Sequence, residues 1–284
     1  MDITLKILSS LVGGKVIGKQ KADQKIENIL FDSRRLNAIN GTVFFAIKTK
    51  TNNGAKYIDD LYNKGIRLFV VQEEMDNYYY DASYLVCENV VDCLQEMAKY
   101  VREKYSIPIV AITGSNGKTI TKDWIVRLID GDKRVCQNTK SFNSQIGVAL
   151  SVCQLNDKAE IGIFEAGISQ KNEMQKLRNM IQPTIGIFTN IGDAHQINFS
   201  SIEEKIDEKL LLFCSCKQII FHDDNPILNS KLRDFCVDNN IELISWGNNN
   251  NDTYKESDIE SEICLPFQDK ASKENAITAY IFCL

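Results

Sequence analysis

The stretch "AITGSNGKTITKDW", residues 111–124, decides how the central part of this sequence folds. The apolar residues before Gly114 predict a short strand, and the amphipathic run from Thr121 onward predicts a helix. The glycines between these two segments predict a tight turn. A strand, a glycine turn and a helix in this order form the context of a phosphate-binding loop, because N–H groups at the start of a helix face an anion.

A Walker A loop has the pattern G-x-x-x-x-G-K-[ST], and Ile112 stands where that pattern places its first glycine. We therefore predict a compact variant of the loop at residues 114–117. In this variant Lys118 would reach the β- and γ-phosphates of a nucleotide, and the hydroxyl of Thr119 would ligate Mg²⁺. The alternative is an ordinary glycine turn before a helix, which the Lys118-Thr119 pair disfavours.

The composition excludes several classes of protein. The 284 residues suffice for two domains, and an apolar fraction of 44% with a charged fraction of 25% is typical of a soluble globular protein. A net charge of −5 and a pI near 5.3 argue against nucleic-acid binding, because no basic surplus covers a face. The nine cysteines include no C-x-x-C, so with two histidines they predict buried free thiols and not a zinc site.

The sequence also argues against membrane insertion. No apolar run approaches the ~20 residues that a spanning helix needs. The first residues, "MDITLKILSSLVGGKVIG" (1–18), predict a helix ended by Gly13-Gly14 and not a signal peptide. We therefore expect a cytoplasmic protein, in which the cysteines stay reduced.

A domain boundary is predicted near Pro108. Before it, "GTVFFAIK" (41–48) and "GIRLFVVQ" (65–72) predict strands, with a helix between them at residues 55–65. A further helix at residues 91–105 should end there, because the residue before a proline avoids the helical conformation. We expect an N-terminal domain at residues 1–106 and a central domain at residues 107–284.

The central domain alternates regularly between strands and helices. Short β-branched runs at 107–114, 160–167, 184–192, 218–224 and 241–247 predict strands, and the segments between them predict helices. This alternation is typical of an α/β fold with a doubly wound, mostly parallel sheet, whose sites lie at the carboxyl ends of the strands. Residues 247–258 predict a polar surface loop.

The motif "TGSNGKT" (113–119) resembles that of the Mur ligase family, ATP-dependent enzymes that build the peptide of the cell-wall precursor. Residues 31–48 resemble the uridine-binding N-terminal module of that family. Residues 138–152 and 164–213 resemble the branch that adds D-alanyl-D-alanine, in particular the form fused to an alanine racemase. The resemblance implies a small N-terminal uridine-binding α/β domain and a central P-loop ATPase domain.

The resemblance also implies roles for individual residues. The residues implied to bind ATP are Gly114, Ser115, Asn116, Gly117, Lys118, Thr119 and Asn275, the last at the adenine. The residues implied to hold Mg²⁺, in two ions, are Thr119, Glu165, His195 and Lys209. Those implied to be catalytic are Lys118, His195 and Lys209. Those implied to contact the UDP-muramoyl substrate are Ser33, Arg34, Thr139, Ser141, Asn143 and Ser169.

The residues by themselves leave simpler interpretations open. Glu165 could be a solvated acid at a strand end, His195 a structural histidine and Asn275 a helix cap. Lys209 matches the lysine that the family carries as a carbamate, an anion that a metal site favours. Lys205 on the same predicted helix is the alternative, and both lysines could be solvated. We favour Lys209 because the apolar residues 210–213 follow it directly.

The implied reaction starts when ATP phosphorylates the terminal carboxylate of UDP-N-acetylmuramoyl-tripeptide. The amine of D-alanyl-D-alanine then attacks the acyl phosphate, and phosphate leaves. The family's C-terminal domain, which should bring that amine, and a racemase domain are not recognisable in this sequence. Two alternatives therefore remain, namely a module that binds ATP and the UDP-sugar without ligation, and the ligase that adds the third, diamino residue.

Overall fold

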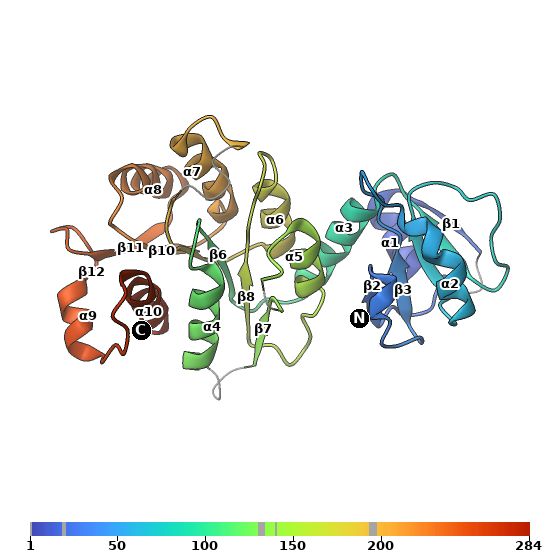
Figure 1. Cartoon of the computed structure of the whole chain (residues 1–284), viewed down its shortest axis with the longest axis horizontal. Coiled ribbons are helices and arrows are strands. Elements are labelled where there is room, and N and C mark those ends of the chain that lie inside the picture. Colours follow the sequence, from blue (N-terminus) through green and yellow to red (C-terminus); the bar gives the residue numbers. More distant parts are fainter. Residues whose placement is uncertain (1, 19–20, 130–133, 140, 193–197) are drawn as a thin grey trace. The chain divides into compact units, whose positions relative to one another are not determined.

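The computed structural model describes residues 2–18, 21–129, 134–139, 141–192 and 198–284 (Figure 1). The chain divides into two compact units, Met1–Val101 and Arg102–Leu284. Each unit contains its own sheet. Among the described residues, every helix is too short or too polar to cross a lipid bilayer.

The first unit is built on a five-stranded sheet with the order β1-β5-β4-β3-β2. Its strands are β1 (Lys15–Ile17), β2 (Asn28–Leu30), β3 (Thr42–Phe45), β4 (Leu68–Val71) and β5 (Ser83–Val86). All neighbours pair in parallel except β1, which runs antiparallel to β5. Its helices are α1 (Leu5–Val12), α2 (Ile58–Asn63) and α3 (Val90–Arg102). As predicted, α1 ends at Gly13, whose φ of 67° is a conformation that glycine adopts readily.

The second unit is built on a seven-stranded sheet with the order β12-β11-β10-β9-β6-β8-β7, in which every pair is parallel. Its strands are β6 (Ile109–Thr113), β7 (Val135–Gln137), β8 (Ile161–Glu165), β9 (Ile185–Phe188), β10 (Gln218–His222), β11 (Glu242–Gly247) and β12 (Tyr254–Lys255). The five strands predicted for the central domain correspond to β6, β8, β9, β10 and β11. The prediction of a polar loop over residues 247–258 was wrong, because it contains β12 and the start of a helix.

The helices of the second unit form two groups (Figure 1). The first group comprises α4 (Lys118–Ile129), α9 (Glu256–Glu262) and α10 (Lys270–Cys283). The second comprises α5 (Gln145–Val152), α6 (Met174–Ile181), α7 (Ile202–Leu210) and α8 (Pro226–Asn239). The helices α4 and α10 pack together on one side of the sheet, while α7 packs on α8 and α5 on α6 on the other side. The expected doubly wound α/β architecture is therefore confirmed.

The central strand β6 marks the point where the winding of the sheet reverses. After β6 the chain first adds β7 and β8 on one side and then adds β9, β10 and β11 on the other. Such a reversal leaves a crevice at the carboxyl ends of the strands, where ligands bind in this class of fold. The residues after β6 are those of the predicted phosphate loop.

Candidate active site

The loop Gly114–Gly117 joins β6 to α4 at this crevice. Its two glycines have φ angles of 142° and 81°, which side-chain-bearing residues rarely adopt. The helix α4 begins at Lys118, earlier than the predicted start at Thr121. Lys118 and Thr119 therefore lie in the first helical turn, where backbone N–H groups have no partner within the helix.

The residues after β9 hold the loop in place. The N–H of Ser115 donates to the carbonyl of Asn190 at 2.8 Å, and the N–H of Asn116 donates to Oδ1 of the same residue at 3.0 Å. The hydroxyl of Ser115 also pairs with the backbone of Gly192. The amides of Ser115 and Asn116 are therefore bound to the protein. They do not face an anion, contrary to the expectation from the sequence. Among the described residues, the N–H groups of residues 117–119 make no hydrogen bond, so an anion would meet the start of α4.

Three lysine side chains reach the backbone around the loop. Lys118 Nζ donates to the carbonyls of Gly114 at 2.9 Å and of Ser115 at 3.1 Å. Lys209 Nζ donates to the same Gly114 carbonyl at 3.1 Å, and Lys205 Nζ donates to the carbonyl of Gly192. Lys205 and Lys209 are only 1% and 3% exposed, so the interpretation of both as solvated residues was wrong.

The electrostatics of these lysines favour an anionic ligand. Burial lowers the pKa of Lys118. The pKa of Lys209 is lowered from 10.5 to about 7. Burial is the main cause, and the positive charges of Lys118 and Lys205 add to it. Both effects arise because cations are held in a poorly solvated site. A bound polyanion would reverse them by supplying the opposite charge.

Glu165 ends β8 beside the loop and is fully buried, which excludes the solvated acid left open by the sequence. Its Oε2 accepts a hydrogen bond from the hydroxyl of Thr119 at 2.7 Å. Its Oε1 lies 3.5 Å from Nζ of Lys122 and accepts no hydrogen bond among the described residues. The N–H of Glu165 donates to Oδ1 of Asn138 at 2.6 Å, which fixes the backbone of the strand end.

Lys122 and Asn138 belong to this site, although they were not predicted from the sequence. Lys122 is 1% exposed, and its Nζ also donates to the carbonyl of Asn138 at 3.0 Å. The predicted amphipathic helix buries its apolar face only in part, because Ile125 is fully buried whereas Leu128 is 54% exposed. The spacing of Lys122, four residues after Lys118, could have shown that both lie on one helix face.

A cavity of about 330 Å³ opens beside the loop. Among the predicted site residues, it is lined by Gly114, Ser115, Lys118, Asn143, Ser169 and Lys209. The amide Nδ2 of Asn143 lies 3.5 Å from Oε2 of Glu165, so this side chain links the cavity to the carboxylate.

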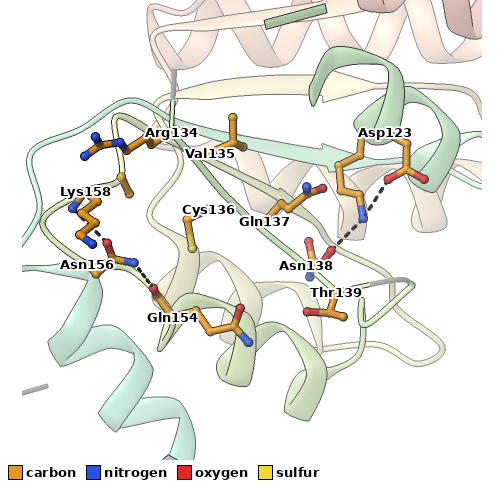
Figure 2. A pocket seen from close by; sticks show the side chains of 12 residues that line it. Asp123, Arg134, Val135, Cys136, Gln137, Asn138, Thr139, Gln154, Asn156 and Lys158 are labelled. Carbon is orange, nitrogen blue, oxygen red and sulfur yellow. Dashed lines mark hydrogen bonds and ion pairs between the residues drawn. The ribbon is translucent and has the colours of Figure 1, made fainter. Parts of the chain in front are cut away.

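Thr139 and Ser141 lie apart from this cavity. Thr139 lines a different pocket of about 710 Å³ along the edge strand β7 (Figure 2). In Figure 2, Thr139 lies beside Asn138, across the pocket from Asn156 and Lys158. The side chain of Ser141 is exposed. The structure thus brings only some of the predicted substrate residues to the phosphate loop.

Asn275 packs against the phosphate loop from α10. Its Oδ1 accepts a hydrogen bond from the hydroxyl of Thr121 at 3.1 Å. A Cβ at Gly117 would lie 2.3 Å from the same oxygen, so the glycine permits this close approach. The helix cap of α10 is Asp269, which excludes the capping role left open for Asn275.

The remaining predicted residues lie elsewhere. Ser33 and Arg34 belong to the first unit, in a short 3₁₀ helix capped by Asp32. Arg34 is mostly exposed, and its hydrogen bonds to Asp32 lower the pKa of that carboxyl to about 2. His195 lies outside the described residues.

The buried Lys209 should make stability depend on pH. Its pKa is about 7 in the folded protein against an ordinary 10.5, so between these values the unfolded chain binds a proton that the folded chain does not. The free energy of unfolding should therefore rise with pH across this window. Below about pH 7 Lys209 is charged in the folded protein as well, so the full cost of burying this charge applies there. Lys209→Met should raise the free energy of unfolding by roughly 2–4 kcal/mol near pH ~6.5 and by little near pH ~10.

Urea denaturation in buffer free of metal and CO₂ measures this difference. The matched control is Lys217→Met, which replaces an exposed lysine and should leave the pH profile unchanged. Equal profiles for wild type and Lys209→Met would mean that the buried amine is not the source of the pH dependence.

The sequence and the structure of this chain are similar to those of known proteins. Residues 112–272 match the family model described as the Mur ligase middle domain. The UDP-N-acetylmuramoyl-tripeptide--D-alanyl-D-alanine ligase of Borreliella burgdorferi is 30% identical over 248 residues, which are 84% of this chain and 52% of that protein. The crystal structure of MurF from Acinetobacter baumannii superposes with a TM-score of 0.86 at 21% identity, covering 99% of this chain and 64% of that one. MurF from Thermotoga maritima, solved in complex with ADP, superposes with a TM-score of 0.69 at 22% identity. This match covers 78% of this chain and 51% of that one.

These similarities agree with the site described above. The chain spans about half the length of the curated relatives it matches. The family model covers more than half of the 284 residues, and the matched range contains the whole phosphate loop together with Glu165 and Lys209. We conclude that this chain belongs to the Mur ligase family.

Proposed function

We propose that this chain supplies the UDP-substrate-binding and ATP-binding modules of a ligase that adds D-alanyl-D-alanine to UDP-N-acetylmuramoyl-tripeptide. The observation that carries the proposal is the arrangement of Lys118, Glu165 and Lys209 around the phosphate loop. The relative from Borreliella burgdorferi, which is named for this reaction, supports the choice of substrates.

The second unit is proposed to bind ATP. The N–H groups at the start of α4 and the ammonium of Lys118 would meet the phosphates, because both carry positive charge into the crevice. Asn275 would meet the adenine, since it lies beside Gly117. The ADP complex of MurF from Thermotoga maritima is consistent with this assignment.

The residues around Glu165 fit a magnesium ion. Mg²⁺ prefers carboxylate and hydroxyl oxygens, and Oε1 of Glu165 is a buried oxygen that accepts no hydrogen bond among the described residues. Glu165, Thr119 and Lys209 as its carbamate would hold this cofactor, and His195 is proposed as a ligand of a second ion. When bound, Mg²⁺ would neutralise charge on the triphosphate.

The carbamate of Lys209 is proposed on chemical grounds. Carbamate formation joins the Nζ atom to the carbon of CO₂ and releases a proton, so the amine must first be neutral. A pKa of about 7 leaves much of the Lys209 amine neutral near neutral pH. The resulting anion would replace a buried cation, which a nearby metal ion would favour.

The remaining predicted residues are proposed to bind the UDP-muramoyl substrate. Ser33 and Arg34 would contact the uridine nucleotide. Asn143 and Ser169 line the cavity beside Lys118 and Lys209, so they would lie where the peptide end of the substrate meets the nucleotide. Thr139 and Ser141 are retained as more distant contacts of the same substrate.

The chemistry assigned to this chain is the activation of a carboxylate. The substrate carboxylate attacks the γ-phosphorus of ATP, the bond to the bridging oxygen breaks, and ADP leaves. Lys118 would stabilise the charge on the phosphoryl oxygens, and the surrounding backbone would hold the reactants in line. The amine of D-alanyl-D-alanine would then displace phosphate from the acyl phosphate.

A trapping experiment tests the proposal on the chain as it stands. With Mg·ATP and UDP-N-acetylmuramoyl-tripeptide, hydroxylamine should convert the acyl phosphate into a hydroxamate, and ADP should form only when the UDP-substrate is present. Lys118→Met should abolish both products, while Lys217→Met should not. No hydroxamate and no substrate-dependent ADP, despite binding of both ligands, would refute the proposal.

The same experiment separates the alternatives. Binding of ATP and UDP-sugar without any ADP formation is the result expected of a binding module without ligase activity. The ligase that adds the third residue would instead activate the UDP-muramoyl dipeptide. A preference for the dipeptide over the tripeptide would therefore assign the chain to that branch.

A further inference from the structure

Three potential metal ligands outside the proposed magnesium site meet at the carboxyl end of β10. His222 ends that strand, Asp224 follows it, and Glu274 comes from α10. One ligand atom of each residue lies within 4.8 Å of those of the other two. The composition argued against a zinc site, whereas this cluster combines one histidine with two acids.

The imidazole of His222 is held with Nδ1 turned toward both carboxylates. The side chain is only 9% exposed, and its ring stacks on Trp246 with the ring centroids 3.8 Å apart. Nδ1 lies 3.7 Å from Oδ2 of Asp224 and 3.6 Å from Oε1 of Glu274. Within the described part of the chain the ring makes no hydrogen bond. A buried imidazole therefore faces the cluster without a hydrogen-bonding partner there.

Glu274 adds a buried carboxylate oxygen to the cluster. Its Oε1 is buried and accepts no hydrogen bond among the described residues. Nζ of Lys270 lies 3.4 Å from this oxygen and 3.8 Å from Oδ2 of Asp224. The Lys270 side chain is 77% exposed, so it can leave the cluster for solvent. A buried carboxylate oxygen left without a hydrogen bond is costly and favours a ligand.

The spacing of the three atoms suits a tetrahedral ion. With bonds of ~2.0–2.2 Å, neighbouring ligand atoms around zinc lie ~3.3–3.6 Å apart. The two Nδ1 distances, 3.7 and 3.6 Å, are close to that range. Asp224 is 37% exposed and follows the strand, so its carboxylate has room to close the third edge.

We propose that His222, Asp224 and Glu274 form a binding site for a divalent transition-metal ion of the zinc class. Imidazole nitrogen with carboxylate oxygens is a donor set that such ions accept. The stacking on Trp246 fixes the plane of the imidazole, as supporting groups around metal ligands commonly do. A bound ion replaces the ammonium of Lys270 and ties α10 to the end of β10.

Metal titration of a single-tryptophan protein tests this site. In the Trp124→Phe variant, Trp246 is the one remaining tryptophan, so its fluorescence reports on the cluster. Cys264→Ser and Cys283→Ser are added to remove the exposed thiols, which could also bind Zn²⁺. With excess Mg²⁺ to occupy oxygen-only sites, Zn²⁺ should change the emission of Trp246, saturate at one ion per chain and raise Tm. Co²⁺ should give the absorption bands of a tetrahedral site.

Variants of the cluster decide the outcome. Asp224→Asn and His222→Gln should each weaken Zn²⁺ binding by at least ~10-fold. Lys270→Met should tighten it, because the competing cation is gone. The matched control is Lys273→Met on the same helix, which removes a lysine that pairs with Glu260 and should have no effect.

Asp224 is exposed, so its variant should fold even if the His222 variant does not. Tm in EDTA checks folding for both. The proposal is overturned if Zn²⁺ fails to bind the wild type, if binding is unchanged in Asp224→Asn, or if Lys270→Met binds more weakly than the control.

Discussion

Gly114→Ala should abolish nucleotide binding, whereas Gly192→Ala should preserve it. A Cβ at residue 114 would lie 2.0 Å from Oγ1 of Thr189 and 3.0 Å from the backbone of Asn190, at a φ of 142°. Strain of this kind costs about 1–3 kcal/mol, and overpacking costs a similar amount. The loop must shift to relieve both, which displaces the start of α4. We expect ADP formation to fall by ~100-fold or more.

The control has neither source of strain, because Gly192 lacks both the crowding and a φ in the region that favours glycine. Among the described residues, a Cβ at Gly192 would come within 4 Å of only two atoms, in Asn116 and Ser115, both at 3.8 Å. Gly192 nevertheless also contacts the loop through its backbone. Binding of a fluorescent ATP analogue to the two variants measures the difference, with Tm recorded for each. Equal affinities would show that the close packing of Gly114 is not needed for the nucleotide site.

Lys122→Met should destabilise the protein strongly. The substitution leaves the fully buried carboxylate of Glu165 without the ammonium 3.5 Å from Oε1. Removing one partner of a buried ion pair costs about 3–5 kcal/mol, because the other charge stays in a poorly solvated site. The free energy of unfolding, measured with urea, should fall by about that amount.

A double variant separates stability from function. Lys122→Met with Glu165→Leu removes both charges and should recover most of the lost stability, because a paired apolar replacement avoids an isolated buried charge. Asn138 still holds the backbone of residue 165 in this variant. Mg²⁺-dependent nucleotide binding should nevertheless stay lost. Recovery of that binding in the double variant would mean that Glu165 is not a metal ligand.

The parts of the fold that follow local rules could be predicted from the sequence. The apolar runs of β6, β8, β9, β10 and β11 are strong signals because strands buried on both faces are nearly continuous in hydrophobicity. The edge strands β7 and β12 contain three and two residues, too few for any periodicity to appear. Their pairing depends on the neighbouring strand, which a local pattern does not record.

The site could be predicted only in part for the same reason. The glycine turn and Lys118-Thr119 form a contiguous motif, so spacing alone indicates a phosphate loop. The contact of Lys122 with Glu165 joins residues far apart in sequence. The cluster of His222 with Glu274 is likewise produced only when α10 packs beside the sheet.

A crystal structure with a non-hydrolysable ATP analogue and Mg²⁺ tests the central claim most directly. We predict that the triphosphate lies at the start of α4 with Lys118 beside it, and that the metal ion contacts Glu165 with Lys209 turned toward the same site. A crevice without nucleotide at saturating concentration, with Glu165 still paired only to Thr119 and Lys122, would contradict it.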